Sequence, residues 1–259
     1  MSNPWIHVQA LPLAGGGTVP ISPEEARHAA GSRRLRDGDA VTVFDGNGSV
    51  AVARFVVGIG GAAHAQFTAV ERRTPCTPRV EIASAVPKGD RLATLLESIA
   101  PLAVATWTPL DCCHSVVRFS DALAQRSRRV LVAACKQSRQ PFVPQVSSAR
   151  SVADCCDDAR RRSLSILLAH PQTEANGAPS AAEDAASAAA VACEGAGVVV
   201  LIGPEGGFSA DEVNAAHARG ARRLVLGESI LRIELAASCA AAILRLGATP
   251  RSAAQAEKK

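Results

Sequence analysis

Residues 201–209 read Leu-Ile-Gly-Pro-Glu-Gly-Gly-Phe-Ser. The apolar run Val198 to Ile202 predicts a buried strand, and Ser209 with Glu212 three residues later predicts the start of a capped helix. The glycines between them let backbone N–H groups approach a ligand closely, because no Cβ stands in the way. No Lys-Ser/Thr follows, so the loop is not a P-loop. From these residues alone, a ligand-binding loop and an ordinary strand-to-helix turn both remain open.

A second loop, residues 226–234, reads Leu-Gly-Glu-Ser-Ile-Leu-Arg-Ile-Glu and precedes a helix rich in alanine. The alanines predict a helix that packs closely against a neighbour. Arg232 and Glu234 stand just before it. They are either an exposed ion pair, worth under about 1 kcal/mol, or part of a site.

Around these loops, apolar runs alternate with helical patterns from residue 80 onward. The expected strands are Val80–Val86, Val104–Thr108, Leu164–Ala169, Val198–Ile202 and Arg223–Leu226. The expected helices are Arg91–Ala100, Ser120–Gln137, Ala181–Cys193, Ala210–Ala218 and Ile233–Leu246. Such alternation predicts an α/β fold, a parallel sheet with helices on both faces, in which ligands bind beyond the carboxyl ends of the strands.

The residues before Arg73 have a different, β-rich pattern. The run 41–44 leads into Asp45-Gly46-Asn47-Gly48, a strong turn signal, and 49–57 and 65–70 are further strand candidates. One helix begins at Ser22-Pro23, where Glu25 is placed to complete a capping box. We therefore expect a small β-barrel over 1–73, a second domain over 74–248 and a frayed tail over 249–259.

Composition narrows the class of protein. The 259 residues are 47% apolar and 20% charged, which is typical of a globular chain. Neither a membrane span nor a secretory signal is recognisable, so we expect a cytoplasmic protein. Eight cysteines without a Cys-x-x-Cys pair favour reduced core fillers over a metal site or disulfides, and we expect no metal.

Charge and aromatic content bear on possible partners. The formal net charge is +4, with basic clusters at 33–36, 126–129, 160–162 and 222–223. Each cluster by itself is typical of a solvated helix face. The chain has no Tyr and 3% aromatic residues, so any nucleic-acid binding depends on phosphate contacts rather than base stacking.

The two loops together, in this order and at this interval, carry a resemblance. The sequence resembles the ribosomal RNA small subunit methyltransferase E family, the uracil-N3 methyltransferases of 16S rRNA in the SPOUT superfamily. Supporting motifs are Lys88-Gly89-Asp90-Arg91, Ser115-Val116-Val117 and Ala134-Cys135-Lys136-Gln137-Ser138. The resemblance covers nearly the whole chain. It implies an RNA-binding PUA-like barrel, followed by a SPOUT-type, trefoil-knotted parallel sheet that binds S-adenosyl-L-methionine. It also implies a homodimer whose RNA site spans both subunits, and no metal.

The resemblance also implies site residues. Those expected at the cofactor are Leu168, Ile202, Gly203, Glu205, Gly206, Gly207, Leu226, Gly227, Ile230 and Leu231. For catalysis we expect Glu234 as the base that removes the uracil N3 proton and Arg232 as the stabiliser of a carbonyl oxygen. For RNA binding we expect His28, Arg33, Arg34, Arg36, Lys88 and Arg91.

One departure from the family pattern leaves alternatives open. Ile233 and Leu235 flank Glu234, where the family usually has threonines. A catalytically weak RNA-binding SPOUT protein is one alternative. Others are a SPOUT methyltransferase acting on another RNA, such as tRNA, and a nucleotide-binding α/β protein without an RNA function.

Overall fold

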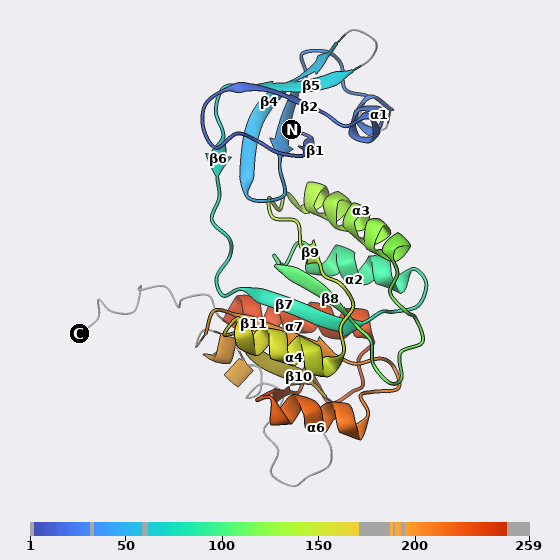
Figure 1. The fold of residues 1–259 in the computed structure, drawn as a ribbon. Helices are drawn as coiled ribbons and strands as arrows, with labels where there is room; N and C mark the ends of the chain where they lie inside the picture. Colours follow the sequence, from blue (N-terminus) through green and yellow to red (C-terminus); the bar gives the residue numbers. More distant parts are fainter. Residues whose placement is uncertain are drawn as a thin grey trace, which may run out of the picture.

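The computed structural model describes residues 3–31, 34–58, 62–170, 187–188, 190–192 and 195–247. Two six-stranded sheets follow one another along the chain. Figure 1 shows the N-terminal sheet at the top beside α1, and the second sheet below it between layers of helices. The long helix α3 lies between the two parts in this view.

The first sheet is mostly antiparallel. Its strands are β1 (Trp5–His7), β2 (Gly17–Pro20), β3 (Ala40–Phe44), β4 (Ser49–Val57), β5 (Ala63–Phe67) and β6 (Glu71–Arg72). The order is β1-β3-β4-β5-β2, with β6 on β4, and β1 with β3 is the parallel pair. In the described part of the chain no pairing joins β2 to β1. One helix, α1 (Pro23–Gly31), accompanies this sheet.

The turn predicted at 45–48 joins β3 to β4. Asp45 Oδ1 accepts from the backbone N–H of Asn47 (2.8 Å) and of Ser49 (3.0 Å). Gly46 and Gly48 have φ values of 74° and 96°, which favour glycine because it has no Cβ to clash. The prediction of a hairpin here is confirmed.

The start of α1 matches the prediction only in part. Ser22 Oγ accepts from Glu25 N–H at 3.2 Å, as an N-cap does. The Glu25 carboxylate is used elsewhere, since both of its oxygens accept from Lys136 Nζ at 2.8 and 2.7 Å. A buried ammonium is a stronger partner than a backbone N–H, which explains why the predicted capping box is wrong here.

The second sheet is parallel throughout. Its strands are β7 (Val80–Ala85), β8 (Thr106–Leu110), β9 (Gln145–Val146), β10 (Ser165–Ala169), β11 (Val198–Ile202) and β12 (Arg222–Leu224). The order is β12-β10-β11-β7-β8-β9. The prediction of a parallel sheet is confirmed, and its carboxyl edge carries the loops quoted at the start.

Helices cover both faces of this sheet, because its strands bury alternate side chains on opposite sides. Val198, Val200 and Ile202 join the core under α2 (Arg91–Ile99), α3 (Asp121–Ser138) and α7 (Ile233–Gly247). Val199 and Leu201 join the core under α4 (Val152–Arg161) and α6 (Ala210–Ala218). The helix expected at 181–193 falls mostly outside the described residues, as does the tail at 249–259.

The two sheets share part of one core. Trp5, Phe44 and Val50 of the N-terminal sheet belong to the same buried cluster as Leu131 and Cys135 of α3. Two backbone hydrogen bonds add to this contact, from Gly48 N–H to Pro141 O and from Val143 N–H to Gly46 O. Among the described residues, no helix is both long and apolar enough to cross a membrane.

Candidate functional site

A pocket of about 380 Å³ opens at the carboxyl ends of β10, β11 and β12. Its walls come from four segments: the end of β10, the loop after β11, the loop after β12 and the first turns of α7. The volume lies within the range of small-molecule sites, and its position matches the rule for ligand binding in parallel sheets. The lining residues are Ala169, His170, Ile202, Gly203, Pro204, Glu205, Gly206, Gly207, Phe208, Leu224, Leu226, Gly227, Ser229, Ile230, Leu231, Ile233 and Ala236.

The loop after β11 is shaped by its glycines. A Cβ on Gly203 would lie 3.1 Å from two ring atoms of Phe208, and a Cβ on Gly206 would lie 3.1 Å from His114 Cβ. Gly207 has a φ of 74°, and its N–H closes a turn onto Pro204 O at 2.8 Å. The chain needs glycine here for packing and for backbone conformation. Ser209 and Glu212 then form the predicted capping box at the start of α6.

Three contacts from residues that do not line the pocket hold this loop and the start of α6. Arg91 Nη2 lies 2.8 Å from Glu205 Oε1. His114 Nδ1 lies 3.1 Å from Gly207 O, and Cys113 N–H donates to Glu212 Oε1 at 2.8 Å. The Arg91–Glu205 pair brings the Lys88–Arg91 motif, 114 residues earlier in the chain (205 − 91), to the rim of the pocket.

The loop after β12 forms the opposite wall. Leu226 and Leu231 are half-buried and pack against the core beside α7, whereas Ile230 is 82% exposed at the rim. Ile233, at the start of α7, is buried and also lines the pocket. Together with Ile202 and Phe208 these residues make a largely apolar cavity, which suits a flat, weakly polar ligand group.

Most of the predicted cofactor residues meet in this pocket. All of them line it except Leu168, which is fully buried in the core beneath α4 and α6. At the end of the same strand the pocket is lined by Ala169 and His170, which the sequence reasoning missed. The signal was available, because His170 directly follows the carboxyl end of a predicted strand.

The two predicted catalytic residues flank the pocket and are not among its lining residues. Arg232 is exposed, and its carbonyl accepts from Ala236 N–H at 2.8 Å in the first turn of α7. Glu234 is half-buried, and its Oε2 is buried without a hydrogen-bond partner among the described residues. A buried carboxylate oxygen without a partner is costly, so it is a candidate for contact with a ligand.

The predicted RNA-binding residues form two groups. Lys88 is exposed beside Arg91 at the pocket rim, whereas His28, Arg34 and Arg36 are exposed on the N-terminal part. His28 is in the last turn of α1, and Arg36 N–H donates to Asp39 Oδ2 at 2.7 Å. Arg33 lies outside the described residues.

The cysteines divide by burial. Burial raises the pKa of the Cys112, Cys135 and Cys155 thiols to about 12 and that of Cys156 to about 11, so these thiols are inert core residues. Cys76 and Cys113 are exposed, so the prediction of a core role is wrong for these two. Cys193 lies outside the described residues. Across the described ranges no group of three or more His, Cys, Asp and Glu could hold a metal ion.

Comparisons with known proteins agree with this architecture. An RNA methyltransferase domain model matches residues 74–245, and an RNA methyltransferase PUA domain model matches residues 21–68. The chain is 27% identical over 243 residues to the ribosomal RNA small subunit methyltransferase E of Mycobacterium tuberculosis, covering 90% of this chain and 88% of that protein. It is 25% identical over 251 residues to the protein of the same name from Bacillus subtilis, covering 91% and 93% of the two chains.

A solved structure has the same fold. The ribosomal RNA small subunit methyltransferase E from Neisseria gonorrhoeae, bound to S-adenosyl methionine, superposes with a TM-score of 0.76 at 23% identity. The superposition covers 95% of this chain and 98% of that one. The expectation of an α/β fold behind a PUA-like N-terminal part is confirmed.

Proposed function

This chain belongs to the RNA methyltransferase family, and we propose that it transfers a methyl group from S-adenosyl-L-methionine to N3 of a uracil in 16S rRNA of the small ribosomal subunit. One observation carries the proposal. Two loops separated by a helix and a strand converge on one apolar pocket, and they bear all the predicted cofactor residues except Leu168. The relatives named above, whose names state this class of substrate, support the choice of RNA.

The pocket fits the cofactor by its shape and its chemistry. Gly203, Gly206 and Gly207 leave backbone groups at the wall where side chains would otherwise stand, and Ile202, Leu226 and Leu231 offer apolar surface to an adenine ring. We assign these residues, with Glu205, Gly227 and Ile230, to cofactor binding. When bound there, the cofactor supplies a methyl group activated by a positively charged sulfonium.

Uracil N3 carries a proton, and a residue of this chain must remove it for methyl transfer to occur. Glu234 carries a buried carboxylate oxygen to which no described residue donates a hydrogen bond, so we assign to it the removal of this proton. Arg232 is exposed two residues earlier, and we assign to it the stabilisation of negative charge on a uracil carbonyl oxygen. Both residues stand at the start of α7 and alternate in sequence with Leu231 and Ile233, which line the pocket.

The role of Glu234 is tested by Glu234→Gln, which keeps the shape and removes the basic oxygen. We expect single-turnover methylation to slow by about 10²–10⁴-fold with unchanged cofactor affinity, because a general base contributes that much. Glu228→Gln is the matched control, since Glu228 is exposed on the same loop. Equal rates in the two variants would remove Glu234 from the chemistry.

The remaining assignments concern organisation and partners. We assign RNA binding to residues 1–73, with His28, Arg33, Arg34 and Arg36 as RNA contacts. We assign methyl transfer to a knotted domain over 74–248, on which Lys88 and Arg91 are further RNA contacts. We also propose a cytoplasmic homodimer without a metal. The exposed Ile230 and Leu235 near the pocket support a second subunit there, since large apolar side chains are commonly covered in an assembly. Analytical ultracentrifugation measures the oligomeric state.

The central experiment is methylation of small ribosomal subunits purified from a strain that lacks this protein. The expected result is transfer of label from the methyl-labelled cofactor to 16S rRNA, with mass-spectrometric mapping that finds 3-methyluridine. Label at another atom of 16S rRNA, or label that is transferred only when tRNA replaces the subunits, would overturn the assigned substrate.

A catalytically weak RNA-binding protein is the second candidate. Ile233 favours it, because this apolar side chain is buried at the pocket where the family usually offers a hydroxyl. This candidate predicts binding of subunits and cofactor without transfer of label in the same assay.

A further inference from the structure

The exposed side of α3 is strongly basic. Arg126, Arg128 and Arg129 are all exposed within one turn in the first half of this helix, and its one acidic residue, Asp121, stands at its first position. We call Arg126, Arg128 and Arg129 the α3 arginine face. None of these three arginines is among the site residues assigned above.

Helix α3 connects the pocket to the N-terminal part. Near its start, Arg126 Nη2 lies 3.3 Å from Asp90 Oδ1, and the next residue, Arg91, contacts Glu205 at the pocket. Near its end, Lys136 Nζ lies 2.7 Å from Glu25 of α1. An 18-residue helix is about 27 Å long, so α3 spans the gap between the two groups of predicted RNA contacts, and the arginine face occupies one turn of it, in the half nearer the pocket.

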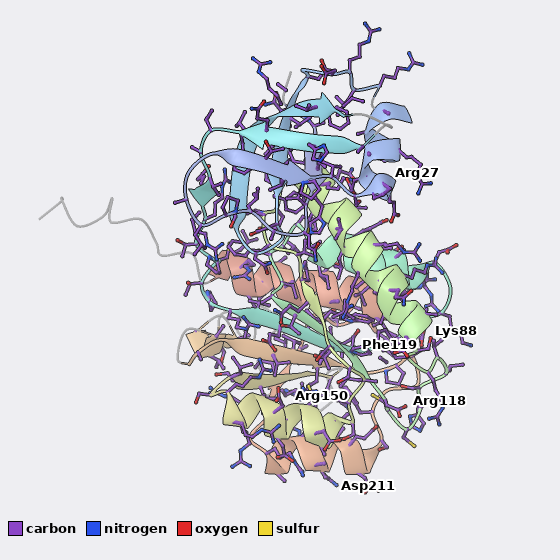
Figure 2. The ribbon with its side chains drawn as sticks, turned by 45° about the horizontal axis from the view of Figure 1, so that its top comes forward. Arg27, Lys88, Arg118, Phe119, Arg150 and Asp211 are labelled. Atoms are coloured by element: carbon purple, nitrogen blue, oxygen red, sulfur yellow. The ribbon has the colours of Figure 1, made fainter. Side chains whose placement is uncertain are left out.

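Figure 2 shows this arrangement from another side. Arg27 of α1 and Lys88 lie on the same side of the molecule, near opposite ends of α3, and Arg118 lies beyond Lys88. Arg118 is 88% exposed, and its closest carboxylate oxygen, on Asp111, is 3.9 Å away. Cationic side chains therefore lie on this side of the molecule near both ends of α3.

The fold makes little structural use of these charges. Arg126 and Asp90 are an exposed pair, with side chains 53% and 100% accessible, and such pairs add little stability. Arg128 and Arg129 form no salt bridge within the described ranges. By contrast, Arg161 and Arg162 at the end of α4 pair with Asp158, and Arg162 also binds Glu81. The α3 arginine face is thus open to an external anion.

We infer that the α3 arginine face binds the phosphate backbone of the substrate RNA along its path from α1 to the mouth of the pocket. The inference rests on the proposed function and adds the path of the RNA over the protein. Guanidinium groups match phosphate oxygens in a two-point geometry. The low aromatic content of the chain also favours phosphate contacts over base stacking.

The test compares two matched double variants, Arg128→Gln/Arg129→Gln on α3 and Arg160→Gln/Arg161→Gln on α4. Each removes two adjacent exposed arginines, and the two helices cover opposite faces of the second sheet. Filter binding of an unmodified 16S rRNA transcript is measured between about 50 and 200 mM KCl, where phosphate contacts dominate the salt dependence. Methylation of undermethylated small subunits gives KM for RNA and kcat.

For the α3 variant we expect weaker RNA binding and a salt slope that is flatter by about 1.4, since each contact to single-stranded phosphate contributes about 0.7. KM for the subunits rises about tenfold, as phosphate contacts position RNA without doing chemistry, while kcat and cofactor affinity stay unchanged. The α4 variant behaves as the wild type.

Two results would overturn the inference: an unaltered slope in the α3 variant, or equal losses in both variants, which would indicate a general charge effect. The binding assay does not depend on catalysis. If the wild type binds the transcript but transfers no methyl group, the proposed function fails. The salt slopes of the two variants still show in that case whether RNA contacts the α3 arginine face.

Discussion

At Gly203 the space for a side chain is already taken. The positions around the missing Cβ are occupied by three atoms of the Phe208 ring at 3.1–3.3 Å, and both residues line the pocket. Gly206 stands in the same relation to His114. At Gly203 the missing Cβ lets the Phe208 ring form part of the pocket wall, whereas at Gly206 it lets His114, which does not line the pocket, pack against the loop.

Gly203→Ala is therefore expected to push the Phe208 ring into the pocket. We expect the Kd for S-adenosyl-L-methionine to rise about tenfold, equivalent to about 1.4 kcal/mol, as measured by calorimetry. Gly31→Ala is the control, because a Cβ there meets no atom within 4 Å and the residue ends α1, on the N-terminal part. An unchanged Kd in Gly203→Ala would contradict the role of the loop.

At the scale of elements, α3 is tied to α1 by one ion pair that is nearly removed from solvent. The side chains of Lys136 and Glu25 are 9% and 17% exposed, and the ammonium contacts both carboxylate oxygens. Removing one partner leaves the other as an uncompensated charge in a largely dry interface.

Lys136→Met is expected to lower the free energy of unfolding by about 3 kcal/mol, measured by urea denaturation. The double variant Lys136→Met/Glu25→Leu should recover most of this loss, because it removes the stranded carboxylate. Glu71→Gln, which breaks the exposed Arg73–Glu71 pair, should cost less than about 1 kcal/mol. A double variant as unstable as the single one would show that the charge is not the cause.

A second buried carboxylate, that of Glu81, joins the amino end of β7 to Arg162 at the end of α4. Burial by itself would raise the pKa of Glu81, but hydrogen bonds and charge from Arg162 and Arg79 outweigh burial and hold this pKa below its ordinary value of 4.5. Thr106 and Asp158 also face this group of charges. The ionised carboxylate is thus favoured in the folded state.

The sign of the pH dependence follows from the lowered pKa. The stabilisation by Glu81 is complete above pH 4.5 and is lost as the pH falls through the lower folded value. We expect the difference in unfolding free energy between wild type and Glu81→Gln to be constant near neutral pH and to shrink below pH 4.5, as measured by urea titrations. A difference that stays constant under acid conditions would exclude this linkage.

At the scale of the whole molecule, the two parts are not independent in packing. Trp5, Phe44 and Val50 of the N-terminal sheet are buried in the cluster that also contains Leu131 and Cys135 of α3. The N-terminal sheet has its own core as well, built around Val41, Val43 and Phe55. The shared cluster holds the N-terminal part in one orientation relative to the pocket.

A fragment of residues 1–73 would expose this shared surface. We expect the fragment to bind the apolar dye ANS, whereas the whole chain does not, because Trp5 and Phe44 lose their cover. Fluorescence titration makes the comparison, and urea unfolding of the fragment checks that its own core persists. A fragment that is folded and does not bind the dye would contradict a shared core.

Much of the fold was predictable because the deciding patterns are local. The strand Val198–Ile202 and the helix Ala210–Ala218 lie where expected, since an uninterrupted apolar run and a capping box are encoded within a few residues. The helix α4 was missed although its signal is local, since Val152, Cys155, Cys156 and Ala159 recur at helical spacing among polar residues and Ser151 caps the first turn. The strand β9, two residues long, carries no periodic signal at all.

By itself, the sequence determined the β-rich start, the parallel α/β remainder and the two loops that form the pocket, because each depends on neighbours in the chain. Tertiary structure alone decided that Arg91 pairs with Glu205 and that Leu168 lies in the core. It also decided that the Glu25 carboxylate pairs with Lys136 and does not cap its own helix. These contacts join residues up to 114 positions apart (205 − 91), and only the packing of α1, α2 and α3 brings them together. A local pattern specifies an element, whereas partners across elements are chosen by burial and charge in the assembled fold.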